Sequence, residues 1–226
     1  MTRFFLIIVT AFWVASAPAG TITGTVNAQG KAEAEQGAAG GKYDSRKYKF
    51  VEKVNYAELR DFVVYIEGAV TNAAPGTNLL QTVLTQKDAT FRPHVLPVVV
   101  GTTVRWPNED DIYHNVFSVS EPRPFDLLLY KGDPPNKAVP FEKTGRVDVF
   151  CSIHSHMHCI VLVLENPYFA SSDRRNHYRI ENVPAGTYKL KAWHERLPSE
   201  VKEITVPATG EVKVDFTLGI NNLPKF

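Results

Sequence analysis

Side chains that bind soft metal ions cluster in one short stretch of this sequence. Cys151, His154 and Met157 stand in a run with the spacing C-x2-H-x2-M, and His114 lies upstream between an acidic turn and an apolar run. A thiolate, two imidazoles and a thioether form the ligand set of a blue-copper electron-transfer site, in which methionine is the weak axial ligand. Because the run fits one tight loop between two strands, the second imidazole must come from elsewhere in the fold. The residue types and their spacing favour copper chemistry of this kind.

The same loop leaves alternatives open. His156 and His158 flank Met157, so His156 could replace His154, although the C-x2-H spacing favours His154. Cys151 and Cys159 are the two cysteines of the chain, and in an oxidising compartment a disulfide between them would exclude the thiolate that copper needs. A structural zinc site from both cysteines and two loop histidines is also chemically possible. With copper at Cys151, Cys159 is expected to be a small buried residue at the start of a strand.

Composition and the first residues bear on partners and location. Lys plus Arg is 25 and Asp plus Glu is 24, so no net charge favours nucleic acid or an anionic membrane surface. Residues 1–17 resemble a secretory signal peptide, with Arg3 before an apolar stretch and small residues at its end. That stretch is too short to span a bilayer comfortably, since about 20 residues are needed, and an uncleaved anchor is the alternative. We expect a periplasmic or secreted protein without a membrane span after cleavage.

Short apolar runs separated by turn residues predict an all-β fold. Helical periodicity is absent between residues 79 and 164, where strand-length runs alternate with Gly, Pro and Asn turns. The strictest in/out alternation falls at residues 211–218. A polar stretch at residues 27–47 has little to bury and is expected to be an insertion or linker. Many short strands of this kind predict a sandwich or barrel.

Two motifs resemble the cupredoxin family of plastocyanin and amicyanin. Residues 106–118 contain Tyr-His-Asn, and residues 150–157 contain the Cys-His-Met loop, which is closest to the short amicyanin version. The resemblance implies one type 1 copper ion with the ligands His114, Cys151, His154 and Met157. It also implies that Asn115 hydrogen-bonds near the cysteine sulfur and ties the two ligand loops together, since such bonds orient ligands and tune the potential.

The flanking segments resemble a second family, the carboxypeptidase-regulatory or transthyretin-like β-sandwich. Residues 20–26 and 63–68 look like its opening strands, and residues 178–190 and 212–218 look like its close. This layout implies a Greek-key cupredoxin sandwich inserted in, or packed beside, a second small sandwich. The expected boundaries are 1–17 for the signal peptide, 20–76 and 166–226 for the outer sandwich, and 77–165 for the cupredoxin domain.

Several functions could use such a copper site. The first is an exported one-electron carrier between redox partner proteins. A copper carrier or buffer without redox cycling is the alternative, but the chain has two Met where such proteins usually have many. An oxidase or nitrite reductase would need a further copper centre from more His-x-His pairs, and here such spacings join only His154, His156 and His158. We therefore expect that the chain is not an enzyme and has no catalytic residues.

Two histidines outside the motifs have simpler interpretations. His94 begins an apolar run and is expected to be a strand-end histidine with one hydrogen bond, not a ligand. His194 is expected on an exposed hairpin tip of the outer sandwich.

Overall fold

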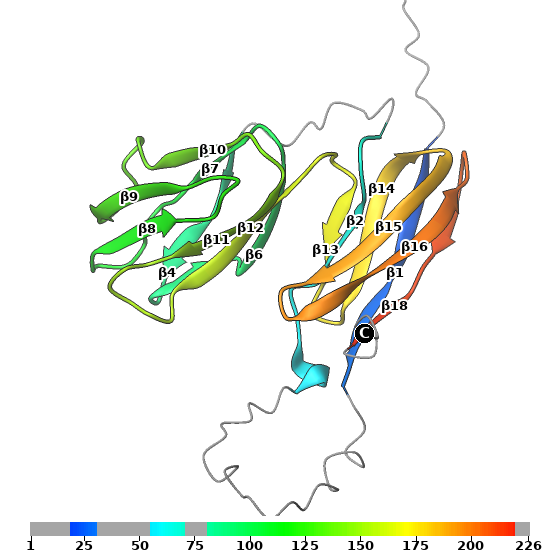
Figure 1. Ribbon diagram of the computed structural model, residues 1–226, viewed down its shortest axis with the longest axis horizontal. Helices are drawn as coiled ribbons and strands as arrows, with labels where there is room; N and C mark the ends of the chain where they lie inside the picture. The colour runs from blue at the N-terminus through cyan, green and yellow to red at the C-terminus, as the bar shows by residue number, and fades with distance from the viewer. Residues whose placement is uncertain (1–18, 31–54, 71–80, 220–226) are drawn as a thin grey trace, which may run out of the picture.

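The computed structural model describes residues 19–30, 55–70 and 81–219, and in these ranges the predicted all-β class is confirmed. Its regular elements there are β-strands, apart from one short 3-10 helix, η3 (Tyr56–Glu58). No helix in these ranges has the length and apolar character needed to cross a bilayer. The predicted signal peptide and most of the predicted polar insertion lie outside the described residues. Figure 1 shows two groups of sheets side by side.

The first group, here called the central sandwich, is built from strands between Gln81 and Leu164. Its five-stranded sheet has the order β6-β12-β11-β8-β9, its three-stranded sheet has the order β10-β7-β3, and β4 and β5 form a hairpin. Apolar side chains from both sheets, among them Trp106 and Phe141, fill one core. The strands are β3 (Gln81–Val83), β4 (Thr85–Lys87), β5 (Thr90–Arg92), β6 (Val95–Val99), β7 (Thr102–Arg105), β8 (His114–Ser118), β9 (Phe125–Tyr130), β10 (Ala138–Phe141), β11 (Gly145–Phe150) and β12 (His158–Leu164).

The second group, the terminal sandwich, combines strands from both ends of the described chain. One sheet has the order β14-β1-β17 with β18 also paired to β1, and the other has the order β13-β2-β15-β16. Its core contains Phe62 and Phe216. The strands are β1 (Ala19–Gln29), β2 (Val63–Ile66), β13 (Phe169–Ser171), β14 (His177–Pro184), β15 (Gly186–His194), β16 (Leu197–Val206), β17 (Glu211–Lys213) and β18 (Phe216–Gly219). The resemblance of these strands to the transthyretin-like family and the expected domain boundaries stay predictions.

Strand β12 lies between the two sandwiches and is buried on both faces. Cys159, Val161 and Val163 face the core of the central sandwich. The alternate residues Ile160, Leu162 and Leu164 form a separate apolar cluster with Val95 of β6 and Val63 of β2. Two-sided burial explains why this segment is apolar at almost every position instead of alternating.

The segment expected as one strand at residues 211–218 is two strands. Both β17 and β18 run parallel to β1, and the chain leaves the ladder between them at Val214 and Asp215. There the Asp215 carboxylate accepts hydrogen bonds from the backbone N–H and the hydroxyl of Thr25, at 2.8 and 3.0 Å. The strand is interrupted because a side chain replaces the backbone as the partner of β1.

Candidate metal centre

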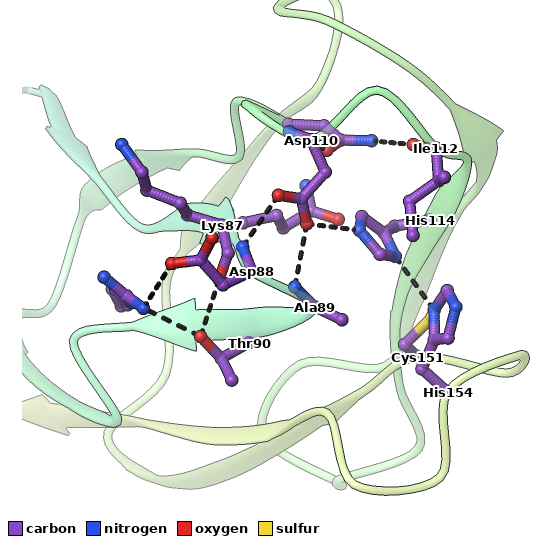
Figure 2. Close-up of polar contacts among 12 residues, drawn as sticks. Lys87, Asp88, Ala89, Thr90, Asp110, Ile112, His114, Cys151 and His154 are labelled. Carbon is purple, nitrogen blue, oxygen red and sulfur yellow. Dashed lines mark hydrogen bonds and ion pairs between the residues drawn. The ribbon is translucent and has the colours of Figure 1, made fainter.

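The structure brings three of the four predicted ligands together at one end of the central sandwich. His114 is the first residue of β8, Cys151 follows the last residue of β11, and His154 lies in the loop between β11 and β12. The Nδ1 atoms of His114 and His154 are 3.0 Å apart, and Sγ of Cys151 is 3.7 Å from Nδ1 of His154. Figure 2 shows the three side chains converging. One ligand atom from each lies within 4.8 Å of the others.

These separations fit a metal ion bound between the three atoms. Metal–nitrogen bonds of about 2.0–2.1 Å and a metal–sulfur bond of about 2.3 Å place two nitrogens about 3.3–3.6 Å apart in tetrahedral to trigonal geometry. The same bond lengths place sulfur and nitrogen about 3.5–3.8 Å apart. The observed sulfur–nitrogen separation of 3.7 Å lies in its range, and the nitrogen–nitrogen separation of 3.0 Å would have to widen by about 0.3 Å. A thiolate with two imidazoles is a donor set that copper accepts, so the residues present fit a copper ion.

The fourth predicted ligand, Met157, closes the loop that carries the others. Its backbone N–H donates to the carbonyl of His154 at 3.0 Å, and its carbonyl accepts from the N–H of Cys151 at 3.2 Å. Its side chain is almost fully buried in the core of the central sandwich. The loop is therefore a closed turn whose two ends are pinned by the antiparallel pairing of β11 and β12, which reaches Phe150 and His158.

Asp110 fixes the ring of His114. The carboxylate lies 2.8 Å from Nε2 of His114, which leaves Nδ1 facing His154. Asp110 is itself held by the backbone N–H groups of Asp88 and Ala89, at 2.7 and 2.9 Å, in the tight turn between β4 and β5 (Figure 2). Burial raises the pKa of Asp110, but the hydrogen bonds from Ala89, His114 and Asp88 outweigh burial and keep the pKa below its ordinary value. A carboxylate behind a histidine ligand orients the ring and increases its basicity.

Asn115 links the two segments that carry the ligands. Its side-chain oxygen accepts from the N–H of Ser152, the residue after Cys151, at 2.7 Å. Its amide nitrogen donates to Asp126 at 2.9 Å. Asn115, which follows His114 on β8, is therefore hydrogen-bonded to the loop that carries the cysteine.

The site is buried except at one edge. His114, Cys151 and Met157 have almost no exposed surface, whereas His154 is partly exposed. Three large apolar side chains that precede the ligands in the sequence are exposed: Ile112 and Tyr113 before His114, and Ile153 before His154, at 48, 58 and 52%. Among these ligands, His154 is therefore the one that is open to the outside.

The alternatives considered for the loop find little support. Both cysteines are free thiols, and Cys159 is completely buried in the core, where burial raises the pKa of its thiol well above the ordinary value. Neither group of potential metal ligands found among the described residues contains Cys159. His156 is exposed beside His154 with the ring centroids 6.2 Å apart.

A second group of potential ligands was missed by the sequence analysis. His94, His158 and Glu195 each offer a ligand atom within 4.8 Å of the others. We expected one hydrogen bond at His94, but its ring has two partners, the carbonyl of His158 and the carboxylate of Glu195. The expectation for His194 is wrong, since its side chain is buried. Nothing in the sequence pairs Glu195 with His94, 101 positions away, and only the packing of the two sandwiches brings them together.

The structure is similar to solved structures of copper proteins. A copper-containing nitrite reductase from Thermus scotoductus SA-01 matches with a TM-score of 0.36 and 30% identity, over 38% of this chain and 23% of that chain. An oxidised amicyanin variant matches with a TM-score of 0.33 and 24% identity, over 37% of this chain and 82% of that chain. A purple cupredoxin from Nitrosopumilus maritimus matches with a TM-score of 0.31 and 24% identity, over 37% of this chain and 97% of that chain. The described part of this chain is itself all-β, in several packed sheets. No family model matches it, and no curated protein is significantly similar to it.

One expectation needs correction in view of these similarities. We expected that the chain is not an enzyme, and this is wrong, because a nitrite reductase, which is an enzyme, is among the similar structures. This chain spans 23% of the length of that reductase, about a quarter.

Proposed function

We propose that this protein is an exported type 1 copper protein that accepts and donates single electrons. The observation that carries the proposal is the convergence of His114, Cys151 and His154 from two separate segments onto one point, with separations that suit a metal ion. Met157 completes the proposed ligand set as the weak axial donor. The partner proteins are redox proteins, and the signal-like residues 1–17 support a periplasmic or secreted location.

The residues around the site can hold its geometry fixed. A copper ion bound there would supply a one-electron couple between Cu(I) and Cu(II). Asp110 holds the ring of His114, and Asn115 holds the cysteine loop through Ser152. The carbonyl and N–H of Met157 close that loop. Because these contacts hold the ligands from several sides, little rearrangement is needed when the charge of the site changes.

The surroundings of the site favour electron exchange at one place. Water is kept from His114, Cys151 and Met157 by burial, so electrons must enter and leave near the partly exposed His154. The exposed apolar side chains of Ile112, Tyr113 and Ile153 give a redox partner a surface that it can contact at this edge.

The visible spectrum of the copper-loaded protein tests the proposal. We expect an intense absorption band from a Cys151 thiolate bound to Cu(II), and a reversible one-electron wave in voltammetry. Cys151→Ser should abolish the band, whereas Cys159→Ser is the matched control and should keep it. Colourless copper binding by the wild type, or an unchanged band in Cys151→Ser, would contradict the proposal. Tight copper binding without a reversible wave would indicate a copper buffer instead.

A further inference from the structure

The second ligand group lies where the two sandwiches meet. His94 precedes β6 and His158 begins β12, both in the central sandwich, whereas Glu195 lies in the turn between β15 and β16 of the terminal sandwich. Nε2 of His94 is 3.0 Å from the Glu195 carboxylate, and the rings of His94 and His158 meet edge to face with centroids 5.5 Å apart. This group shares no residue with the copper centre.

Each histidine is oriented by its other ring nitrogen. Nδ1 of His94 lies 3.2 Å from the carbonyl of His158, so it can donate there and leave Nε2 as the lone-pair nitrogen toward Glu195. Nε2 of His158 lies 3.0 Å from the carboxylate of Asp148, which leaves Nδ1 for another partner. A carbonyl or carboxylate on the second nitrogen is the arrangement that metal-binding histidines usually show.

The local charge also suits a cation. Glu195 and Asp148 are acidic, and Arg146, whose guanidinium pairs with Asp148 at 2.6 and 2.9 Å, is a basic residue beside them. With neutral histidines the group keeps one negative charge. The side chains of His94, His158 and Glu195 are 34, 26 and 21% exposed, so an ion could enter from solvent and lose part of its hydration.

We propose that His94, His158 and Glu195 form a second metal site that binds a divalent ion of the zinc type across the junction of the two sandwiches. Two imidazoles and one carboxylate are a donor set that zinc binds, with a fourth position left for water. Ligand atoms around zinc lie about 3.3–3.6 Å apart, so the three groups must adjust by about 1 Å, which side-chain rotation can supply. Because Glu195 comes from the other sandwich, the bound ion would join the two.

Zinc titration of the copper-loaded protein tests this site. With copper occupying the first centre, isothermal titration with zinc alone should show one additional zinc ion per chain. Glu195→Gln and His94→Gln should each lower the zinc affinity at least about tenfold. His177→Gln removes an exposed histidine of the terminal sandwich and is the matched control, with an expected affinity equal to that of the wild type.

The same titration in a variant without the copper centre distinguishes zinc binding at this site from zinc binding at the copper centre. Cys151→Ser removes the sulfur ligand from the first centre, and this variant should still bind one zinc ion that the additional change Glu195→Gln removes. Zinc binding that disappears with Cys151→Ser, or that is unaffected by Glu195→Gln, would overturn the proposal. Circular dichroism of each variant checks that it is folded.

Discussion

At the scale of single residues, one carboxylate decides which nitrogen of His114 can bind a metal. Asp110 occupies Nε2, and the ring is completely buried, so Nδ1 is left facing His154 and the cysteine. The position of Asp110 depends in turn on two backbone N–H groups of the β4–β5 turn, at Asp88 and Ala89. The orientation of His114 therefore depends on two successive contacts: its own contact with Asp110, and the contact of Asp110 with the turn.

We expect Asp110→Asn to weaken copper binding by about 10–100-fold, the usual effect of losing a carboxylate behind a histidine ligand. Asn has nearly the same shape, but it is neutral and can present an amide N–H to the ring, so His114 is no longer fixed in one tautomer. Competition with a copper chelator measures the affinity. Asp111→Asn makes the same charge change at an exposed neighbour that pairs with Lys131, and it should leave the affinity unchanged. Equal losses in both variants would show that overall charge, not ring orientation, is responsible.

The sequence predicts the candidate ligands better than it predicts the residues that hold those ligands in place. Cys151, His154 and Met157 are close in the chain, and their spacing alone indicates one loop. The resemblance then supplies His114 and Asn115. Asp110 lies only four residues before His114, but its role depends on the β4–β5 turn, whose contact with residue 110 is tertiary and leaves no mark in a spacing pattern.

At the scale of strands, β1 is the element on which the terminal sandwich is assembled. It pairs with β14 on one side and with β17 and β18 on the other. Gly24 lies opposite the point where β17 ends, and a Cβ atom built on it would lie 1.8 Å from the carbonyl oxygen of Val214 and 2.6 Å from its carbonyl carbon. The backbone of Val214 donates to Thr23 at 2.7 Å, so it cannot withdraw without losing that bond.

Gly24→Ala should therefore lower the free energy of unfolding by about 1–3 kcal/mol or more, the cost of forcing extra atoms into a packed region. Urea unfolding followed by fluorescence measures this change. Gly186→Ala in the same sandwich is the control, because its new Cβ atom would meet the end of the Tyr188 side chain at 3.1 to 3.4 Å, and a small shift of that side chain relieves the contact. If both variants have wild-type midpoints, the close approach at Gly24 is not a constraint on the fold.

Strand prediction succeeded where apolar runs are long and failed where strands are short. The sequence has apolar or alternating runs at residues 125–130 and 187–193, which are long enough to predict strands, and β9 and β15 lie there. By contrast, β4, β5 and β13 have three residues each, and the sequence analysis assigned no separate strands there. Three residues carry too little alternation to be distinguished from a loop, and such strands exist because their neighbours supply hydrogen bonds. The break between β17 and β18 has the same cause, since Asp215 ends the ladder through a contact with Thr25 across 190 positions.

At the scale of the whole molecule, the junction of the two sandwiches combines an apolar cluster with polar contacts. The continuous apolar run of β12 could have indicated burial on two faces, but not that the second face lies against Val63 of β2. The pairing of first and last strands in the terminal sandwich is likewise a property of the complete chain. The resemblance of the flanking segments to a transthyretin-like sandwich suggested this pairing. The pattern of apolar and polar residues within each segment could not.

His194, at the end of β15, is buried beside this junction and makes the stability of the molecule depend on pH. Its ring lies 4.9 Å from that of Phe62, and its Nδ1 accepts a hydrogen bond from the N–H of Arg196 at 3.1 Å. Burial lowers the pKa of His194 below its ordinary value of 6.5, and the nearby positive charge of Arg196 acts in the same direction. Glu195, Asp61 and the carbonyl of Arg60 oppose this shift without reversing it.

A lowered pKa in the folded state means that the unfolded chain binds the proton more readily. The contribution of neutral His194 to stability is therefore present above about pH 6.5 and is lost as the pH falls below that value. We expect the free energy of unfolding of the metal-free protein to fall less in His194→Asn than in the wild type between about pH 7.5 and about pH 5.5. Asn can still accept the hydrogen bond from Arg196, and the His94–Glu195 pair is common to both proteins, so its own pH dependence cancels in the comparison.

Urea unfolding at the two pH values gives the difference, with His177→Asn as an exposed-histidine control that should follow the wild type. Identical pH dependence in wild type and His194→Asn would mean that the buried ring accepts a proton in the folded protein as easily as in the unfolded chain.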